Sequence, residues 1–295
     1  QSTAGDSTLS LTGGLNNQQG FVSAGNRLTL NGAEMDNRDG VLVAKHIDLT
    51  SQALTNRNGL IQGSDALTIN TQGNLLDNSG TNGDSTGLRS GGSLSLSTGG
   101  LNNQGGLIAA NALTVRGQDV DNRQGLINST GYSQLTTGDL NNQSGVIQSG
   151  GSISLDTRGA GLHNEQGTLL ADKILTLSAG ALGNAQGLIQ GGAGLTVAGS
   201  QLDNGRGQLL SGGGLTTRVD SLNNDAGLIY AAGDADVSAS QDLRNQQGLI
   251  KADGALTVSA AQLDNQNTRG SGQGIEARDL TLNAASLNNQ SGALR

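Results

Sequence analysis

Apolar and polar positions alternate along the chain in short runs that recur about every 20 residues. In the first run of each repeat, an apolar residue and a small residue flank a variable one, as Ile229 and Ala231 flank Tyr230. In the second, two apolar residues enclose a threonine, as in LTV at 113–115. In–out–in alternation is typical of a strand with one buried side, and threonine tolerates the solvent-facing position. Each repeat therefore predicts two or three strands of about three to five residues and no helix.

A corner motif, Leu-x-Asn-x-x-Gly, separates these runs from end to end of the chain. It reads LNNQQG at Leu15, VDNRQG at Val120 and LNNQSG at Leu287, with small departures elsewhere. Fourteen copies span 272 residues in thirteen steps, a mean step near 21. Regular spacing of this kind indicates an ordered array rather than a disordered low-complexity chain.

The short period decides between repeat folds. Propeller blades need about 40 residues or more, whereas a unit near 20 fits one coil of a parallel β-helix. We expect an all-β protein: one continuous β-solenoid over residues 1–295, with about 14 coils stacked ~4.8 Å apart into a rod ~65 Å long. A single coil buries too few side chains to offset its backbone ordering, so coils must fold against neighbours.

The third residue of the corner motif is always asparagine. A primary amide both donates and accepts hydrogen bonds, so stacked asparagines can form a structural ladder along the coils. We expect the glycine at the sixth position of the motif, for example Gly125, to supply a positive φ at the corner. The predicted ladder consists of Asn17, Asn37, Asn56, Asn78, Asn103, Asn122, Asn142, Asn164, Asn184, Asn204, Asn224, Asn245, Asn265 and Asn289.

The alternation also predicts which side chains point inward. Residues seven and nine positions after the leading leucine should be buried, whereas the residue six positions after it, such as Phe21 or Leu126, should be partly exposed at the corner.

Two repeats are longer than the others, and both lengthen just after the ladder asparagine. The sequence SGTNGDSTGLRSGG follows Asn78, and QNTRGSGQG follows Asn265. Such insertions should leave the coil as loops, and removal of residues 81–87 is expected to leave folding intact. Asp84, Arg89 and Arg269 are the candidate binding residues of these loops.

The motifs resemble the haemagglutinin repeats of filamentous haemagglutinin-type exoproteins, a group that includes contact-dependent growth inhibition exoproteins of Gram-negative bacteria. The shared pattern is L-[DN]-N-x-x-G-x-[IL]-x-[AS] followed by L-T-[LV], and it covers residues 9–294. The resemblance implies a right-handed parallel β-helix. It also implies two-partner secretion through an outer-membrane transporter to the surface of a Gram-negative cell, and a role as a stalk or adhesin.

Composition narrows the possible partners. The net charge of −8 has the wrong sign for gripping a nucleic-acid backbone, and no apolar run is long enough for a transmembrane helix. The chain has no cysteine, so it has no disulfide or thiolate site.

Neither terminus has a helix or polar cap in the pattern. We therefore expect an excised piece of a longer array whose ends fray or pair with another copy.

No catalytic, cofactor or metal site is expected. Most acids occupy the variable second position of the corner motif, as Asp36 and Asp77 do, or stand in isolation, and both groups read as solvated turn residues. Asp234 and Asp236 lack the repeat of calcium-binding β-rolls, and His46 and His163 should lie on the surface. Tyr132 and Tyr230 are the only tyrosines that could stack on a sugar.

Two functional hypotheses remain. In the first, the chain is a structural stalk segment that presents a distal adhesive or toxic module. In the second, it is an adhesin module that binds a cell-surface receptor or glycan directly. An enzyme is a remote third.

Overall fold

The computed structural model describes residues 5–295, which divide into two compact units. Unit 1 extends to Gly150 and unit 2 begins at Gly151. The described residues form strands, turns and bends, without a helix. All strand pairings described within the units are parallel, and corresponding strands of successive repeats pair with one another. Each unit contains seven of the fourteen repeats, so the parallel β-solenoid predicted from the pattern is confirmed.

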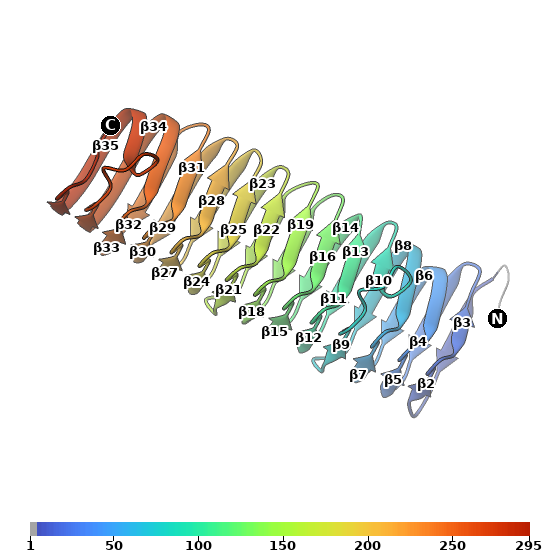
Figure 1. The fold of residues 1–295 in the computed structure, drawn as a ribbon. Helices are drawn as coiled ribbons and strands as arrows, with labels where there is room; N and C mark the ends of the chain where they lie inside the picture. Colours follow the sequence, from blue (N-terminus) through green and yellow to red (C-terminus); the bar gives the residue numbers. More distant parts are fainter. Residues whose placement is uncertain (1–4) are drawn as a thin grey trace. The chain divides into compact units, whose positions relative to one another are not determined.

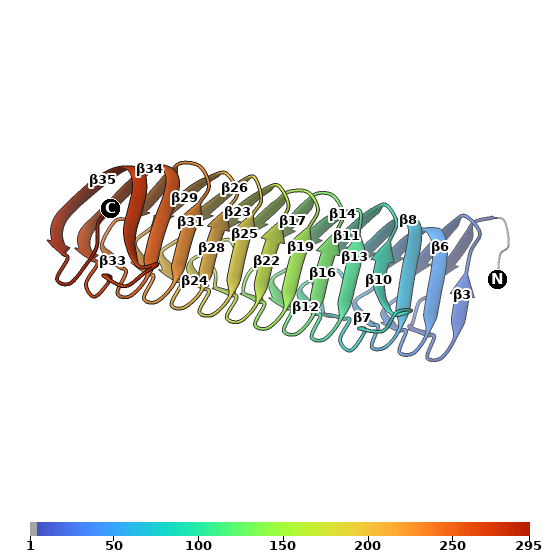
Figure 2. The same cartoon turned by 45° about the horizontal axis from the view of Figure 1, so that its top comes forward.

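Unit 1 stacks its strands in three columns, and Figures 1 and 2 show, in blue to green, the strands of successive repeats side by side within a column. Column 1, directly after each asparagine corner, contains β3 (Phe21–Ser23), the start of β6 (Val41–Thr50), the start of β8 (Leu60–Asn70), β10 (Gly87–Ser90), β13 (Leu107–Ala110), β16 (Leu126–Ser129) and β19 (Val146–Ser149). Column 2 contains β1 (Ser7–Ser10), β4 (Arg27–Asn31), the ends of β6 and β8, β11 (Ser93–Ser97), β14 (Ala112–Arg116) and β17 (Ser133–Thr136). Column 3 leads into the corners with β2 (Leu15–Asn16), β5 (Glu34–Asp36), β7 (Ala53–Thr55), β9 (Leu76–Asp77), β12 (Gly100–Asn102), β15 (Asp119–Asp121) and β18 (Leu140–Asn141).

Unit 2 repeats the same three columns. Column 1 contains β22 (Thr168–Ala171), β25 (Leu188–Gly191), β28 (Gln208–Ser211), β31 (Leu228–Ala231) and the starts of β34 (Leu249–Asp264) and β35 (Gly274–Asn288). Column 2 contains β20 (Ile153–Asp156), β23 (Ile174–Ser178), β26 (Gly194–Ala198), β29 (Gly214–Val219), β32 (Ala235–Ala239) and the middle of β34 and β35. Column 3 contains β21 (Leu162–His163), β24 (Ala181–Gly183), β27 (Gln201–Asp203), β30 (Ser221–Asn223), β33 (Asp242–Arg244) and the ends of β34 and β35.

Most strands are as short as the alternation predicts, but four run on through a corner. β6, β8, β34 and β35 have 10, 11, 16 and 15 residues and cover two or three columns each. The β6–β8 and β34–β35 ladders each shift register once, where the chain passes from column 1 to column 2. At these corners the strand bends but stays in the sheet. The sequence pattern, in contrast, predicts a break between two strands there.

Between the first and the last coil, the core of a coil is a thin layer of aliphatic side chains from all three columns. In the middle of unit 1, Ile127, Val115 and Leu101 are at most 2% exposed. Their neighbours Leu126 and Phe21, six positions after a leading leucine, are half-buried and 61% exposed respectively. The predicted strand phase is therefore confirmed.

The corner geometry corrects one expectation. The positive φ falls on the fifth residue of each motif, as in Gln124 with φ 55°, and not on the glycine that follows. In twelve of the fourteen corners that fifth residue is not a glycine: Gln19, Asp39, Asn58, Gln124, Ser144, Gln166, Gln186, Arg206, Ala226, Gln247, Asn267 and Ser291.

The glycine is needed because of space, not because of its φ. A Cβ on Gly125 would lie 2.6 Å from Oδ1 of Asn122 and closer still to the carbonyl oxygen of Asn103 in the neighbouring coil. Real side chains do not approach backbone that closely, so in a corner without an insertion the sixth position admits no side chain.

We predict opposite outcomes for substitutions at these adjacent positions. Gly125→Ala should lower the free energy of unfolding by roughly 1–3 kcal/mol, because its Cβ overlaps the backbone of the preceding coil. Gln124→Gly should stay within about 0.5 kcal/mol of the parent, since relief of the left-handed strain offsets the greater chain entropy of glycine. Thermal and urea unfolding of both variants would measure this. A large loss for Gln124→Gly with little change for Gly125→Ala would contradict it.

Candidate functional site

The asparagines of the corner motif form a buried file of hydrogen bonds. Asn122 is fully buried, and its Nδ2 donates to Oδ1 of Asn142 at 2.7 Å and to the carbonyl oxygens of Gly125 and Val146 at 3.3 Å. Its own Oδ1 accepts from Nδ2 of Asn103 at 2.7 Å. The side chain thus joins its own corner to the coils on both sides.

The same bond repeats through each unit. Side-chain amides from Asn17 to Asn142 in unit 1, and from Asn164 to Asn289 in unit 2, are linked Nδ2 to Oδ1 at 2.7–2.8 Å. Every donor is the asparagine of the earlier repeat, so the file has one direction. The structure places all fourteen candidate residues in these two files.

The first insertion leaves the coil between two residues that stay in the sheet. Thr81 occupies the place of the corner glycine; its Oγ1 donates to the Asn78 carbonyl at 2.8 Å and accepts from the Leu107 amide at 3.0 Å. In regular corners a glycine N–H and C=O fill these two roles. Gly87, with φ 98°, then resumes column 1 by pairing with Leu60. Residues 82–86, which we call loop 1, lie outside the sheet.

The second insertion is built in the same way. Thr268 Oγ1 donates to the Asn265 carbonyl at 2.9 Å and accepts from the Ala293 amide at 3.0 Å. Gly274, with φ 119°, resumes column 1 opposite Leu249. Loop 2 is residues 269–273, the same length as loop 1. Sequence reasoning missed these threonines, although the signal was present: threonine replaces the sixth-position glycine only in the two lengthened repeats.

The bonds that Thr81 and Gly87 make to the sheet correct the expected limits of the removable segment. Deleting 81–87 would also remove Thr81 and Gly87, which bond into the sheet, so the dispensable segment is loop 1 alone. Both loops are visible in Figure 1, in front of β10 and of β34.

The three candidate binding residues differ in their surroundings. Asp84 is exposed in loop 1, and Arg269 is exposed in loop 2. Arg89, on β10, is half-buried and holds loop 1, since its guanidinium donates to the carbonyls of Thr86 at 2.7 Å and Gly83 at 3.1 Å. Asp84 therefore belongs to loop 1, and Arg89 anchors that loop from the neighbouring strand β10.

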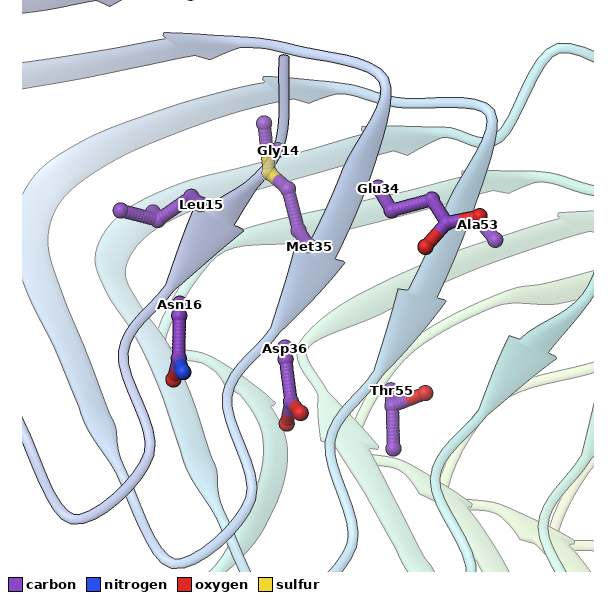
Figure 3. A pocket seen from close by; sticks show the side chains of 8 residues that line it. All are labelled: Gly14, Leu15, Asn16, Glu34, Met35, Asp36, Ala53 and Thr55. Atoms are coloured by element: carbon purple, nitrogen blue, oxygen red, sulfur yellow. The ribbon is translucent and has the colours of Figure 1, made fainter.

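A surface groove of about 360 Å³ runs across β2, β5 and β7 of unit 1. Figure 3 shows Asn16, Asp36 and Thr55 pointing the same way from these three neighbouring strands. Glu34 lines the same groove and is exposed. Two carboxylates in one groove invite a test for acid–base chemistry.

Asp36 fails that test. Hydrogen bonds from the Arg38 guanidinium, the shortest at 2.6 Å, lower the pKa of Asp36 to about 2. A general acid or base works best with a pKa near the operating pH, whereas this carboxylate stays ionised near neutral pH and is paired with Arg38. The same Asp-Asn-Arg pairing recurs at Asp121 and Arg123. Burial raises the pKa of Asp121, but the hydrogen bonds from Arg123 outweigh burial, so the pKa lies below its usual value.

Asp77 corrects the expectation that corner acids are solvated. It is only 6% exposed, and its carboxylate accepts from Nε of Arg57 at 2.6 Å, from the Ser79 amide and from Nδ2 of Asn102. Because each oxygen has a donor, its charge is compensated. Asp77 therefore braces the corner from which loop 1 departs.

Metal ligands do not gather in the described part of the chain, where no group of three or more histidines and acids could hold an ion. Asp236 pairs with Arg218 at 3.2 Å, and Asp234 accepts from a backbone amide. His163 has Glu165 at 3.9 Å, so it is less isolated than expected. Residues 5–295 also include no helix that could cross a membrane.

One surface cluster on unit 2 combines an aromatic ring with charges. The Tyr230 hydroxyl donates to Asp253 at 2.5 Å, and the Lys251 ammonium lies 3.5 Å from Asp253 and 5.9 Å from the ring centre. The hydrogen bond to Asp253 raises the pKa of Tyr230. Among the described tyrosines, Tyr132 is 48% exposed and makes no comparable cluster.

Comparison with known families identifies the repeat. The family model of the haemagglutinin repeat matches residues 2–80, 78–160, 134–188, 149–219, 184–275 and 268–295. The chain belongs to the haemagglutinin-repeat family, which implies a filamentous, adhesin-like segment of a secreted or cell-surface protein. Searches of curated proteins and of solved structures find no match.

We predict that replacing a ladder asparagine lowers the free energy of unfolding more than replacing a surface asparagine does. Asn122→Ala should lower the free energy of unfolding by about 2–5 kcal/mol, because it leaves a buried donor on Asn103 and a buried acceptor on Asn142 unpaired. Asn128→Ala, at an outward position of β16, should change it by less than about 0.5 kcal/mol. Equal losses in urea titrations of the two variants would contradict a ladder role.

Proposed function

We propose that the chain is a structural stalk segment of a secreted two-partner secretion exoprotein, which presents a distal adhesive or toxic module away from a Gram-negative cell. The observation that carries the proposal is the ladder: each coil devotes one side-chain amide, buried in every coil except the last, to bonding with its neighbours. Seven coils at ~4.8 Å give each unit a length of about 34 Å along its own stack. Extension by repetition is the property that a stalk requires.

The chemistry of the surface supports the same proposal. Outward positions of column 1 vary between repeats, from Gln190 and Leu210 to Lys251, and share no polar set. The acidic groove holds its aspartate in an ion pair, which gives no support to catalysis. We therefore propose a non-enzymatic role, with an outer-membrane transporter as the secretion partner by family resemblance.

We further propose that residues 1–295 form a single continuous solenoid. The support comes from the sequence, because the step from Leu140 to Leu162 lies within the range of the other steps, and three family matches run across residue 150.

A continuous solenoid should unfold as one unit. Calorimetry of the whole chain is expected to show one transition, and Asn224→Ala, which breaks the ladder of unit 2 only, should lower the temperature of that entire transition. Two separable transitions, of which Asn224→Ala shifts one and leaves the other in place, would contradict continuity.

The second candidate function, direct adhesion, is favoured by the two anchored loops and by the Tyr230 cluster. Exposed loops on a rigid scaffold are common binding elements. The stalk proposal predicts that the labelled chain, added to host or bacterial cells, shows only weak, non-saturable association.

Three variants make this test specific. One lacks loop 1 and carries Thr81→Gly, a second lacks loop 2 and carries Thr268→Gly, and the third is Tyr230→Ser. Each should fold like the parent, because the changes lie outside the ladder. Saturable binding by the parent that any of the three abolishes would replace the stalk proposal with the adhesin.

A further inference from the structure

Four asparagines in the chain precede a glycine, and this dipeptide carries a chemistry of its own. The backbone nitrogen of the second residue can attack the side-chain amide of the first, and glycine offers the least steric hindrance to that attack. The reaction needs a backbone N–H that is not held by an acceptor and a chain that can bend. The four pairs are Asn31–Gly32, Asn58–Gly59, Asn82–Gly83 and Asn204–Gly205.

Three of the four glycine N–H groups are held by acceptors. The amide of Gly32 donates to the Thr50 carbonyl at 3.1 Å, and that of Gly59 to the Asn56 carbonyl at 3.0 Å. The amide of Gly205 donates to the Asp203 carboxylate at 3.0 Å. The side chain of Asn204 is moreover buried in the ladder.

The fourth pair lies in loop 1 and is arranged differently. Asn82 and Gly83 are exposed, and the Gly83 N–H has no acceptor within residues 5–295. The Gly83 carbonyl, in contrast, accepts hydrogen bonds from Thr86 and from Arg89, and these bonds hold the loop in place. This leaves the nucleophilic nitrogen and the target amide free together.

Exposure alone does not separate the pairs, since Asn31 and Asn58 are exposed as well. Asn31 ends strand β4, and Asn58 sits in a corner with φ 52°. What distinguishes Asn82 is its position outside the sheet together with the unheld amide that follows it.

We propose that Asn82 is a site of spontaneous deamidation. The Gly83 nitrogen bonds to Cγ of Asn82, the C–N bond of the side-chain amide breaks, and the amide leaves as ammonia with the proton of the Gly83 N–H. Water then opens the resulting succinimide at either carbonyl and yields aspartate or isoaspartate at position 82. No oxidant, metal or enzyme is required.

The product changes loop 1 without disturbing the solenoid. A new carboxylate appears two residues from Asp84, and isoaspartate adds one methylene to the main chain. Thr81 and Gly87 carry the sheet bonds on either side of the loop, so the extra length is confined between them. The modification gives the exposed loop an age-dependent charge, independently of the proposed function.

The experiment incubates the folded, full chain in mildly alkaline buffer and follows each asparagine by peptide mass spectrometry, with isoaspartate detected by enzymatic methylation. Asn82 should convert about tenfold or more faster than Asn31, Asn58 or Asn204, because each of those must first break a hydrogen bond. Gly83→Ala should slow conversion at Asn82 alone; its Cβ would have its nearest neighbour, Thr86 Oγ1, at 3.4 Å, so the variant fits the loop.

The urea-unfolded chain is the matched control, in which the four sites should react at similar rates. Faster conversion at Asn31 or Asn58 in the folded chain would overturn the proposal. So would a preference for Asn82 that is equally large after unfolding, since the structure would then have no part in the selectivity.

Discussion

The rest of the structure depends on the hydrogen bond between the side-chain amides of successive asparagines. Burying a primary amide is unfavourable unless its donor and acceptor are both satisfied. Here each Oδ1 receives the Nδ2 of the previous repeat, so no coil satisfies its own amide alone. Aspartate offers no donor and glutamine adds a methylene, so neither could take this place. A shift of register by one residue would unpair every amide in the file at once, and the ladder therefore fixes the register as well as the stacking.

The shape of the corner follows from that bond. To bring Asn122 into the stack, the chain turns tightly enough that the sixth residue touches the backbone of the preceding coil, and in the corners without a loop it is glycine. The left-handed residue then falls one place earlier, on Gln124 and its counterparts. Left-handed strain in a residue such as Ala226 amounts to about 1–2 kcal/mol, which the bonds around the corner must hold in place.

The sequence predicts the periodic features of the structure, but not those that depend on a single contact. The ladder, the strand phase and the parallel stack all follow from spacing, because a recurring residue at a fixed offset has one place in a coil. Glycine at the sixth position has two physical explanations, a positive φ or a lack of space, and composition cannot separate them. The brace of Asp77 by Arg57 joins two coils at outward positions, and the grip of Arg89 on loop 1 uses backbone carbonyls, so neither leaves a sequence motif.

The two lengthened repeats show how the array tolerates change. A loop must remove one glycine N–H and one C=O from the corner, and unpaired backbone groups there would weaken the stack. The hydroxyl of Thr81 replaces both, because one oxygen can donate and accept together. Loop 1 and loop 2 can thus vary freely while the ladder beneath them is unbroken. Any recognition that the surface of this chain acquires is therefore separable from its stability, since recognition can change in the loops and outward columns while the buried amides keep the coils in place.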